Sequence, residues 1–346
     1  MRVGIIGGGF IAQIAHIEPL SRVARVELVA LCEPDNALRN RVADRFAIPQ
    51  RFDRPEPLIA LELDAVVVAL PMLAQELVVE QVLATGTSVL SEKPMATTPH
   101  AAQRLVELAE RTGARWAVGF MKRHDAGVVR LAQLVERALV DGRWGRLLHV
   151  SMRDFCGEYG ATPPDHFRRD GSRQWRYPES PCAPNDIAEH DHSHWMYSLN
   201  VLSHDINLLH HLLGELHPNS FAVHEGGVQR LAMTSNHCPV DLVAGPARFG
   251  RWDQRLDFTF ETALVSCVLP SPLDSTAEAT VTVASKEGTE VLADSDAPRW
   301  AFDHQSKNFV TALEKGDDFI NSAARCLRDM DVIHSMWTKT NETSVD

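Results

Sequence analysis

The chain has 346 residues, a formal net charge of −12, 45 % hydrophobic residues and 23 % charged residues. This length exceeds the size at which a single hydrophobic core keeps growing, so we expect two domains. The composition excludes disordered, collagen-like and membrane-spanning classes, and a net negative charge without long runs of like charge argues against nucleic acid as a partner.

Six cysteines are scattered along the chain without a C-x-x-C pair, which argues against a zinc knuckle or a compact disulfide framework. Reduced thiols are typical of the cytosol. The amino terminus, MRVGIIGGG, has too few apolar residues before its glycines to form the core of a signal peptide. No apolar run of about 18 residues follows. We therefore expect a cytoplasmic protein that does not span a membrane.

The first part of the chain alternates between predicted strands and predicted helices. A short apolar run at 3–6 ends at three glycines, and a segment with helical spacing follows at 10–20. An apolar run at 26–32 then precedes an Arg- and Ala-rich helix that continues to about residue 46. Further strands are expected at 65–69, 88–91 and 116–119, and further helices at 75–84 and 99–112. This alternation predicts a parallel sheet with helices on both faces.

The pattern changes after residue 120, and we place the domain boundary at residue 122. The predicted architecture is α/β, with an N-terminal Rossmann domain at 1–122 and a C-terminal α+β domain at 123–346. In the second domain a long helix at 126–140 precedes a strand at 147–155. Alternating segments from 221 to 292 predict a largely antiparallel open sheet.

A proline-rich, charged stretch between Tyr159 and Asn185 has little periodicity. Long irregular segments in compact proteins are usually functional, so we expect a loop near the mouth of a site.

The run Gly7-Gly8-Gly9-Phe10-Ile11-Ala12 fits G-x-G-x-x-A, the pattern of dinucleotide-binding turns. The first glycine permits a tight turn, the second lets backbone N–H groups approach a pyrophosphate, and Ala12 allows close packing of helix on strand. The start of the helix adds positive partial charge. Glu33 ends the second strand, where a carboxylate accepts hydrogen bonds from ribose hydroxyls and repels a 2′-phosphate, so NAD is favoured over NADP. The alternative is an ordinary glycine-rich turn.

Glu92-Lys93-Pro94, directly after the strand that ends at Ser91, resembles a motif of the Gfo/Idh/MocA family of glucose–fructose and inositol dehydrogenases. Other segments also resemble this family, namely GTSVLSEKP at 86–94, DAVVVALP at 64–71, YSLNVLSHDINLLHHLL at 197–213 and the helical stretch at 302–336. The resemblance covers nearly the whole chain. It implies a homodimer or homotetramer, because the antiparallel sheets of this family usually pair face to face between subunits.

The resemblance implies that Lys93 lies beside the nicotinamide and the substrate hydroxyl. An ammonium at a strand end can hydrogen-bond a developing alkoxide and, when partly desolvated, can exchange a proton near neutral pH. The alternative is a lysine that only solvates a turn. The residues predicted to bind the cofactor are Gly7, Gly9, Phe10, Ile11, Glu33, Leu70, Pro71, Gln75, Glu92 and Lys93.

His204 stands where the family carries its substrate-binding histidine, and a histidine can act as a general acid or base near neutral pH. The family's two flanking aspartates are amides here, Asn200 and Asn207, which can bind a hydroxyl but cannot relay a proton. Asp205 is the next candidate to orient the imidazole, although its position points about 100° away around the helix. The alternative is a histidine with a structural role in the interior.

Substrate contacts are predicted for Tyr197, Asn200, Asn207 and Lys122. Lys122 and the adjacent Arg123 could hold a substrate carboxylate or phosphate, or could solvate the start of a helix. The alternating histidines of the 189–195 stretch lack the spacing and the downstream cysteine of recognised zinc motifs. We therefore predict a polar substrate loop there and no metal site.

These features predict an NAD-dependent oxidoreductase that acts on a secondary alcohol or ketone of a sugar, cyclitol or related polyhydroxylated metabolite. Two alternatives stay open. One is a redox-neutral lyase, hydrolase or epimerase, in which transient oxidation at one carbon permits chemistry at another. The other is a non-catalytic dinucleotide sensor, because the loss of both flanking carboxylates could mean the loss of catalysis.

Overall fold

The computed structural model describes residues 1–155, 186–247, 252–292 and 300–338, and the chain folds into two compact units. Among the described residues, the first unit comprises Met1–Phe120 and Phe302–Arg328, and the second comprises the remainder. The predicted boundary at residue 122 is close to the observed break after Phe120. The sequence placed all residues from 123 onward in one domain, whereas the structure returns Phe302–Arg328 to the first unit.

The first unit is built on a six-stranded parallel sheet with the strand order β3-β2-β1-β4-β5-β6. Its strands are β1 (Arg2–Ile6), β2 (Glu27–Cys32), β3 (Gln50–Phe52), β4 (Ala65–Val68), β5 (Ser88–Ser91) and β6 (Trp116–Val118). All four residues of β4 are buried, as expected for a parallel strand covered on both faces. The strand order reverses between β1 and β4, and ligands of such sheets bind at the carboxyl ends of the strands beside this reversal.

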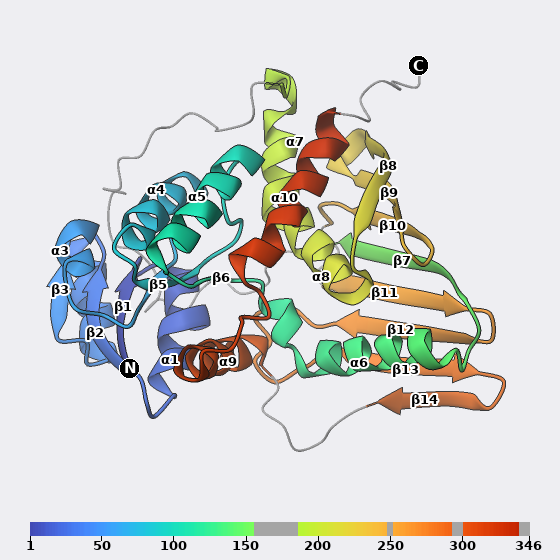
Figure 1. Cartoon of the computed structure of the whole chain (residues 1–346), viewed down its shortest axis with the longest axis horizontal. Helices are drawn as coiled ribbons and strands as arrows, with labels where there is room; N and C mark the ends of the chain where they lie inside the picture. The colour runs from blue at the N-terminus through green and yellow to red at the C-terminus, as the bar shows by residue number, and fades with distance from the viewer. Residues whose placement is uncertain (156–185, 248–251, 293–299, 339–346) are drawn as a thin grey trace. The chain divides into compact units, whose positions relative to one another are not determined.

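The predicted helices of the first unit are all present, close to their predicted bounds. A π-helical segment (Ala12–Ile17) continues into α1 (Glu18–Ser21), and the others are α2 (Asn36–Arg45), α3 (Pro55–Ile59), α4 (Met72–Leu83) and α5 (Pro99–Thr112). Thr98 caps α5 by accepting a hydrogen bond from the N–H of Ala101, and α5 ends at Gly113, whose φ is 74°. Helices α4 and α5 lie side by side (Figure 1). The sequence missed only the short elements β3 and α3, which carry no periodic pattern.

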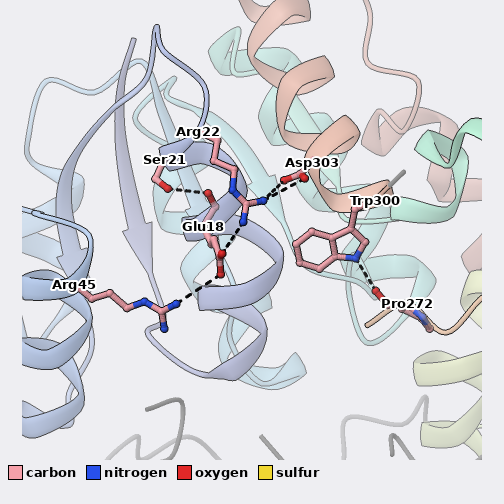
Figure 2. Close-up of polar contacts among 7 residues, drawn as sticks. All are labelled: Glu18, Ser21, Arg22, Arg45, Pro272, Trp300 and Asp303. Atoms are coloured by element: carbon pink, nitrogen blue, oxygen red, sulfur yellow. Dashed lines mark hydrogen bonds and ion pairs between the residues drawn. The ribbon is translucent and has the colours of Figure 1, made fainter. Parts of the chain in front are cut away.

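Helix α9 (Ala301–Lys315) belongs to the first unit because its apolar face is part of that unit's core. Phe309 and Val310 are buried in the same hydrophobic cluster as Val3 and Leu31. On the surface, Arg22 donates to Asp303 at 2.9 Å and to Glu18 at 2.6 Å (Figure 2). The Arg22 side chain is 51 % exposed, so these ion pairs contribute little and burial of the apolar face determines where α9 packs.

The backbone also joins this segment to the parallel sheet. The N–H of Val118 donates to the carbonyl of Asn321 at 3.0 Å, and the Asn321 side-chain amide donates to the carbonyl of Val118. The next helix, α10 (Ala323–Thr338), starts in the first unit and belongs to the second from Asp329 onward.

The second unit contains an eight-stranded sheet in the order β14-β13-β12-β11-β7-β10-β9-β8. The strands are β7 (Leu147–Phe155), β8 (Leu216–Val223), β9 (Gln229–Ser235), β10 (Pro239–Ala244), β11 (Asp253–Phe260), β12 (Ala263–Leu269), β13 (Thr280–Ser285) and β14 (Gly288–Leu292). Only the β7–β10 pair is parallel within this sheet, which confirms the predicted, largely antiparallel architecture. Every second residue of β11 is buried, so one face of the sheet is covered.

Besides the end of α10, this unit contains α6 (Ala126–Asp141), α7 (His192–Tyr197) and α8 (Ser203–Leu213), the last two joined by a π-helical segment (Ser198–Leu202). Figure 1 shows α6 along β12 and β13. The approach is close at Gly127, where an added Cβ would lie 1.8 Å from the carbonyl oxygen of Ala279. Asp125 caps α6 by accepting from the N–H of Gly127 and also accepts from the N–H of Ala279 at 3.0 Å, so one carboxylate ties helix to strand.

Gly7 is the position of the first unit that least tolerates a side chain. Its φ is +105°, and an added Cβ would lie 2.2 Å from the carbonyl oxygen of Ala69. We expect Gly7→Ala to lower the free energy of unfolding by about 3 kcal/mol or more, through backbone strain and the forced shift of β4. Urea unfolding followed by circular dichroism measures this loss.

The matched control is Gly113→Ala, at a glycine whose φ is also positive (+74°) but whose added Cβ would meet no atom within 4 Å. Gly113→Ala should lower the free energy of unfolding by about 1–2 kcal/mol, from backbone strain alone. Equal losses in the two variants would show that the contact with Ala69 does not matter.

Candidate functional site

The glycine turn after β1 is held in place by two side chains. The Gln13 side-chain amide donates to the carbonyl of Gly8 at 2.8 Å, and the N–H of Gly8 donates to Glu33 Oε2 at 2.9 Å. The other oxygen of Glu33 accepts from the N–H of Asp35 at 3.1 Å, and Glu33 is fully buried. The carboxylate at the end of β2 is therefore fixed directly against the turn.

This arrangement fits a dinucleotide. Gly9, Phe10 and Ile11 open the first helix and are only partly buried, so the start of the helix is accessible to an anion. The glycine pattern predicted from the sequence thus occurs in the strand–turn–helix context that the binding of a pyrophosphate requires.

The other residues predicted to bind the cofactor also follow carboxyl ends of the parallel strands. Leu70 and Pro71 come after β4, with Pro71 at the start of α4, and Glu92 and Lys93 come after β5. Because β2, β1, β4 and β5 are neighbours, their carboxyl ends form one edge of the sheet. The structure therefore brings the turns that carry the predicted cofactor residues to a single edge.

The turn that carries Lys93 is held by the first turns of α4. The Gln75 side-chain amide donates to the carbonyl of Glu92 and, at 2.9 Å, to that of Pro94. Glu76 Oε2 accepts from both the N–H and the hydroxyl of Thr97, at 3.0 and 2.7 Å. Gln75 is 1 % exposed, so the structure gives this side chain a role in shaping the turn. Contact of Gln75 with the cofactor stays a prediction.

His16, in the first helix, is a site residue that no pattern in the sequence predicted. Its Nε2 lies 2.7 Å from Glu92 Oε1, and the His16 side chain is fully buried. No spacing rule connects these residues, because the contact depends on where the first helix crosses the sheet. Burial raises the pKa of Glu92, but the hydrogen bond and charge of His16 and the charge of Lys93 outweigh it, so this pKa lies below its ordinary value.

In the second unit, the predicted substrate face consists of the end of α7 and the start of α8. Asn200 is exposed, and Tyr197 and His204 are partly buried. Asn200 is therefore accessible to a ligand of this unit, whereas the Tyr197 hydroxyl and His204 Nδ1 are buried. Contact of all three side chains with substrate stays a prediction.

Asn207 lies deeper in the same unit, at 1 % exposure. Its side-chain oxygen accepts from Arg123 Nε at 2.6 Å, and its side-chain nitrogen donates to Asp329 Oδ2 at 2.6 Å. Asp329 Oδ1 lies 2.5 Å from His210 Nδ1. This buried network gives both polar atoms of the Asn207 amide a protein partner, which favours a structural role for Asn207 over the predicted contact with substrate.

Lys122 lies in a second buried cluster. Its Nζ is 3.5 Å from Asp205 Oδ1 and 3.7 Å from Asp154 Oδ2, and the Gln254 side-chain amide donates to the same two oxygens at 2.6 and 2.9 Å. Burial raises the pKa of Asp205 well above its ordinary value, the charge of Asp154 adds to this, and the opposing effects of Lys122 and Gln254 are smaller.

Burial, the charge of Asp154 and the hydrogen bond between the two carboxyl groups therefore favour the protonated form of Asp205. Asp205 Oδ2 is a buried oxygen that no donor of the described residues reaches, which also favours its protonated form. With Asp205 protonated, Lys122 Nζ faces a carboxyl pair that carries a single negative charge.

The histidine-rich stretch forms a short 3₁₀ turn (Glu189–Asp191) and the start of α7. His190 is exposed, and His192 Nε2 lies 3.2 Å from the carbonyl oxygen of Ile187. Within the described ranges, no group of three or more His, Cys, Asp or Glu side chains is arranged to hold a metal ion. The loop predicted at 159–185 lies outside the described residues.

Comparison with known proteins connects the first unit to a family. Residues 1–120 match the profile described as "Oxidoreductase family, NAD-binding Rossmann fold". The inositol 2-dehydrogenase/D-chiro-inositol 3-dehydrogenase of Shouchella clausii (strain KSM-K16) is 37 % identical over 145 residues, and an inositol 2-dehydrogenase of Corynebacterium glutamicum (strain R) is 34 % identical over 151 residues. These alignments cover 40 % and 43 % of this chain, and 41 % and 43 % of the two relatives.

The fold as a whole also occurs in solved structures. The 3-ketoreductase KijD10 of Actinomadura kijaniata, in complex with NADP and TDP-benzene, superposes with a TM-score of 0.76 and 18 % identity, covering 98 % of both chains. This similarity shows a shared fold across both units. In the part of the chain that the structure describes, no helix is both long and apolar enough to cross a membrane.

The raised pKa of Asp205 predicts how the free energy of unfolding depends on pH. Above about pH 4 the unfolded chain has lost a proton that folded Asp205 keeps, so the free energy of unfolding falls as the pH rises. Asp205→Asn mimics the protonated form and should remove this dependence. As the pH rises, the free energy of unfolding of the variant should increase relative to that of the wild type by up to about 1.4 kcal/mol per pH unit. This increase should stop where Asp205 of the folded wild type ionises.

Urea unfolding of both proteins at pH 5.5 and pH 8.5 measures the difference. Parallel pH dependences in the two proteins would contradict the raised pKa of Asp205.

Proposed function

Because residues 1–120 match the profile of the oxidoreductase family with an NAD-binding Rossmann fold, we propose that this chain is an NAD-dependent oxidoreductase acting on CH–OH groups. Its substrate is a secondary alcohol or ketone of a sugar, cyclitol or related polyhydroxylated metabolite. The observation that carries the proposal is the glycine turn, Glu33 and Lys93 at one edge of the parallel sheet. The inositol dehydrogenases that align with the first unit support this substrate class.

In this proposal the first unit holds the cofactor through the N–H groups at the start of the first helix. The bound dinucleotide supplies a hydride acceptor. Glu33 binds ribose hydroxyls and disfavours a 2′-phosphate, so NAD is preferred over NADP. Leu70, Pro71 and the turn shaped by Gln75 border the nicotinamide end.

Lys93 donates a hydrogen bond to the reacting oxygen as its charge changes, and His204 moves the proton of the same hydroxyl group. Asn200 and Tyr197 bind neighbouring hydroxyl groups of the substrate. Lys122 contributes no uncompensated positive charge to the site, because Asp154 and Asp205 together neutralise its ammonium. We therefore assign an uncharged polyhydroxylated substrate to the site in preference to a sugar acid or a sugar phosphate.

We also propose that the protein is a cytoplasmic homodimer or homotetramer. Four buried cysteines of the described residues form no disulfide, which fits a reducing compartment, namely Cys32, Cys238, Cys267 and Cys326. Exposed apolar side chains on the eight-stranded sheet provide area for pairing with a second copy, namely those of Leu148, Leu264, Val268 and Val291.

A redox-neutral reaction is the second candidate, favoured by the amides Asn200 and Asn207 where the family has aspartates. An enzyme of this kind would convert substrate without accumulating NADH and would copurify with NAD. A non-catalytic sensor is a third candidate, and it would bind NAD without turnover of any substrate.

Lys93→Ala tests the assigned chemistry. With NAD and a panel of polyols, sugars and nucleotide sugars, the variant should lose about 10²–10⁴-fold in kcat, because no ammonium stabilises the reacting oxygen. Its Kd for NAD should stay within about threefold of the wild type. NADH absorbance and product chromatography together measure turnover in both the oxidative and the redox-neutral case.

Lys307→Ala, at an exposed position of α9, is the matched control and should behave as the wild type. Turnover by Lys93→Ala at the rate of the wild type would overturn the mechanism. Absence of NAD binding by the wild-type protein would overturn the proposed function as a whole.

Glu33→Gln tests the choice of cofactor. The variant keeps a hydrogen-bond acceptor for the N–H of Gly8 but loses the negative charge. We expect its preference for NAD over NADP to fall by about tenfold or more, measured by calorimetric titration with each dinucleotide. Glu27→Gln, at the exposed start of β2, is the control and should keep the preference. An unchanged ratio in Glu33→Gln would remove Glu33 from the discrimination.

A further inference from the structure

The carboxylate of Glu92 is enclosed from three directions. His16 Nε2 lies 2.7 Å from Oε1, and the N–H of Lys93 donates to Oε2 at 3.3 Å. Gly119, just after β6, closes the third side, where an added Cβ would lie 3.2 Å from Oε1 and 3.4 Å from the Cα of Glu92. The His16 side chain is 0 % exposed and that of Glu92 is 13 % exposed. The contact between the two side chains is therefore shielded from solvent.

His16 links this carboxylate to the glycine turn. It lies in the π-helical segment Ala12–Ile17, and Gln13, on the same segment, holds the carbonyl of Gly8. Segments of this kind carry one extra residue per turn and often occur at functional sites. One rigid segment therefore fixes both the turn proposed to bind the pyrophosphate and the acid next to Lys93.

The Glu92 carboxylate interacts with two positively charged groups, His16 and Lys93. The charged groups that act most strongly on it are His16 and Lys93, and the neighbours Gln75 and Gly119 are uncharged. Glu92 is ionised despite its burial, since these two groups lower its pKa. A buried carboxylate needs a charged or hydrogen-bonded partner, and His16 provides one for Glu92.

We propose that His16 is a positioning residue for Lys93: as an imidazolium it neutralises the Glu92 carboxylate and so weakens the hold of that carboxylate on the Lys93 ammonium. Lys93 then releases its proton closer to neutral pH than it would beside an unpaired glutamate. The inference rests on the proposed function, in which the Lys93 ammonium donates a hydrogen bond to the reacting oxygen.

Two isosteric variants should act in opposite directions. His16→Gln keeps a hydrogen-bond donor for Glu92 but removes the positive charge, so Lys93 should hold its proton to higher pH. Glu92→Gln keeps an acceptor for His16 but removes the negative charge, so Lys93 should lose its proton at lower pH. Each shift should be about one pH unit. A merely structural role would produce no such pair of opposite shifts.

Reductive methylation with ¹³C-formaldehyde followed by NMR measures this without cofactor or substrate. The chain contains six lysines, so the dimethylamine resonances can be resolved, and Lys93→Arg assigns that of Lys93. The titration midpoint of this resonance is compared in the wild type, His16→Gln and Glu92→Gln. His100→Gln, at an exposed position of α5, is the matched control and should not move the midpoint.

An unchanged midpoint in His16→Gln, or shifts of both variants in the same direction, would overturn the proposal. Should His16→Gln fail to fold, ¹⁵N shifts of the His16 ring in the wild type decide. A doubly protonated ring at pH 7 supports the proposal and a neutral ring overturns it. The proposed function fails on other observations, namely the absence of NAD binding or undiminished turnover by Lys93→Ala.

Discussion

The contact of Gly7 with the carbonyl of Ala69 is the constraint on which the first unit depends. It lets the chain leave β1 in a left-handed conformation directly beside β4, where the strand order reverses. The first helix then starts over the edge at which β2, β4 and β5 also end. Glu33, Leu70 and Lys93 reach that edge because each follows one of these strands. A side chain at residue 7 would separate β1 from β4 and disturb the turns on both sides.

Buried polar groups perform the corresponding task in the second unit. Arg123, Asn207 and Asp329 form one hydrogen-bonded network, and Lys122, Asp154, Asp205 and Gln254 form another. Both networks hold α8, the helix that begins with Ser203 and His204. Buried charges are costly unless they are paired, and here the pairing also fixes the helix that is proposed to bind substrate. The amide at residue 207 fits this structural role, which its position in the sequence could not reveal.

Local pattern was sufficient for much of the fold. The apolar runs predicted the parallel strands, alternation predicted the antiparallel sheet, and the glycines predicted the turn after β1. Contacts between distant segments were beyond reach, because they depend on packing that no spacing encodes. His16 meets Glu92 only after the first helix has docked on the sheet, and Gln75 hydrogen-bonds the Lys93 turn only after α4 has done so. Phe302–Arg328 likewise returns to the first unit because the apolar face of α9 fits its core.

The central claim is that the edge formed by these turns binds NAD with its nicotinamide beside Lys93. A crystal structure of the protein grown with saturating NAD tests this most directly. The account predicts the pyrophosphate on the N–H groups that open the first helix, the adenosine ribose at Glu33 and the nicotinamide next to the Lys93 ammonium. A dinucleotide bound anywhere else, or a nicotinamide directed away from Lys93, would contradict it.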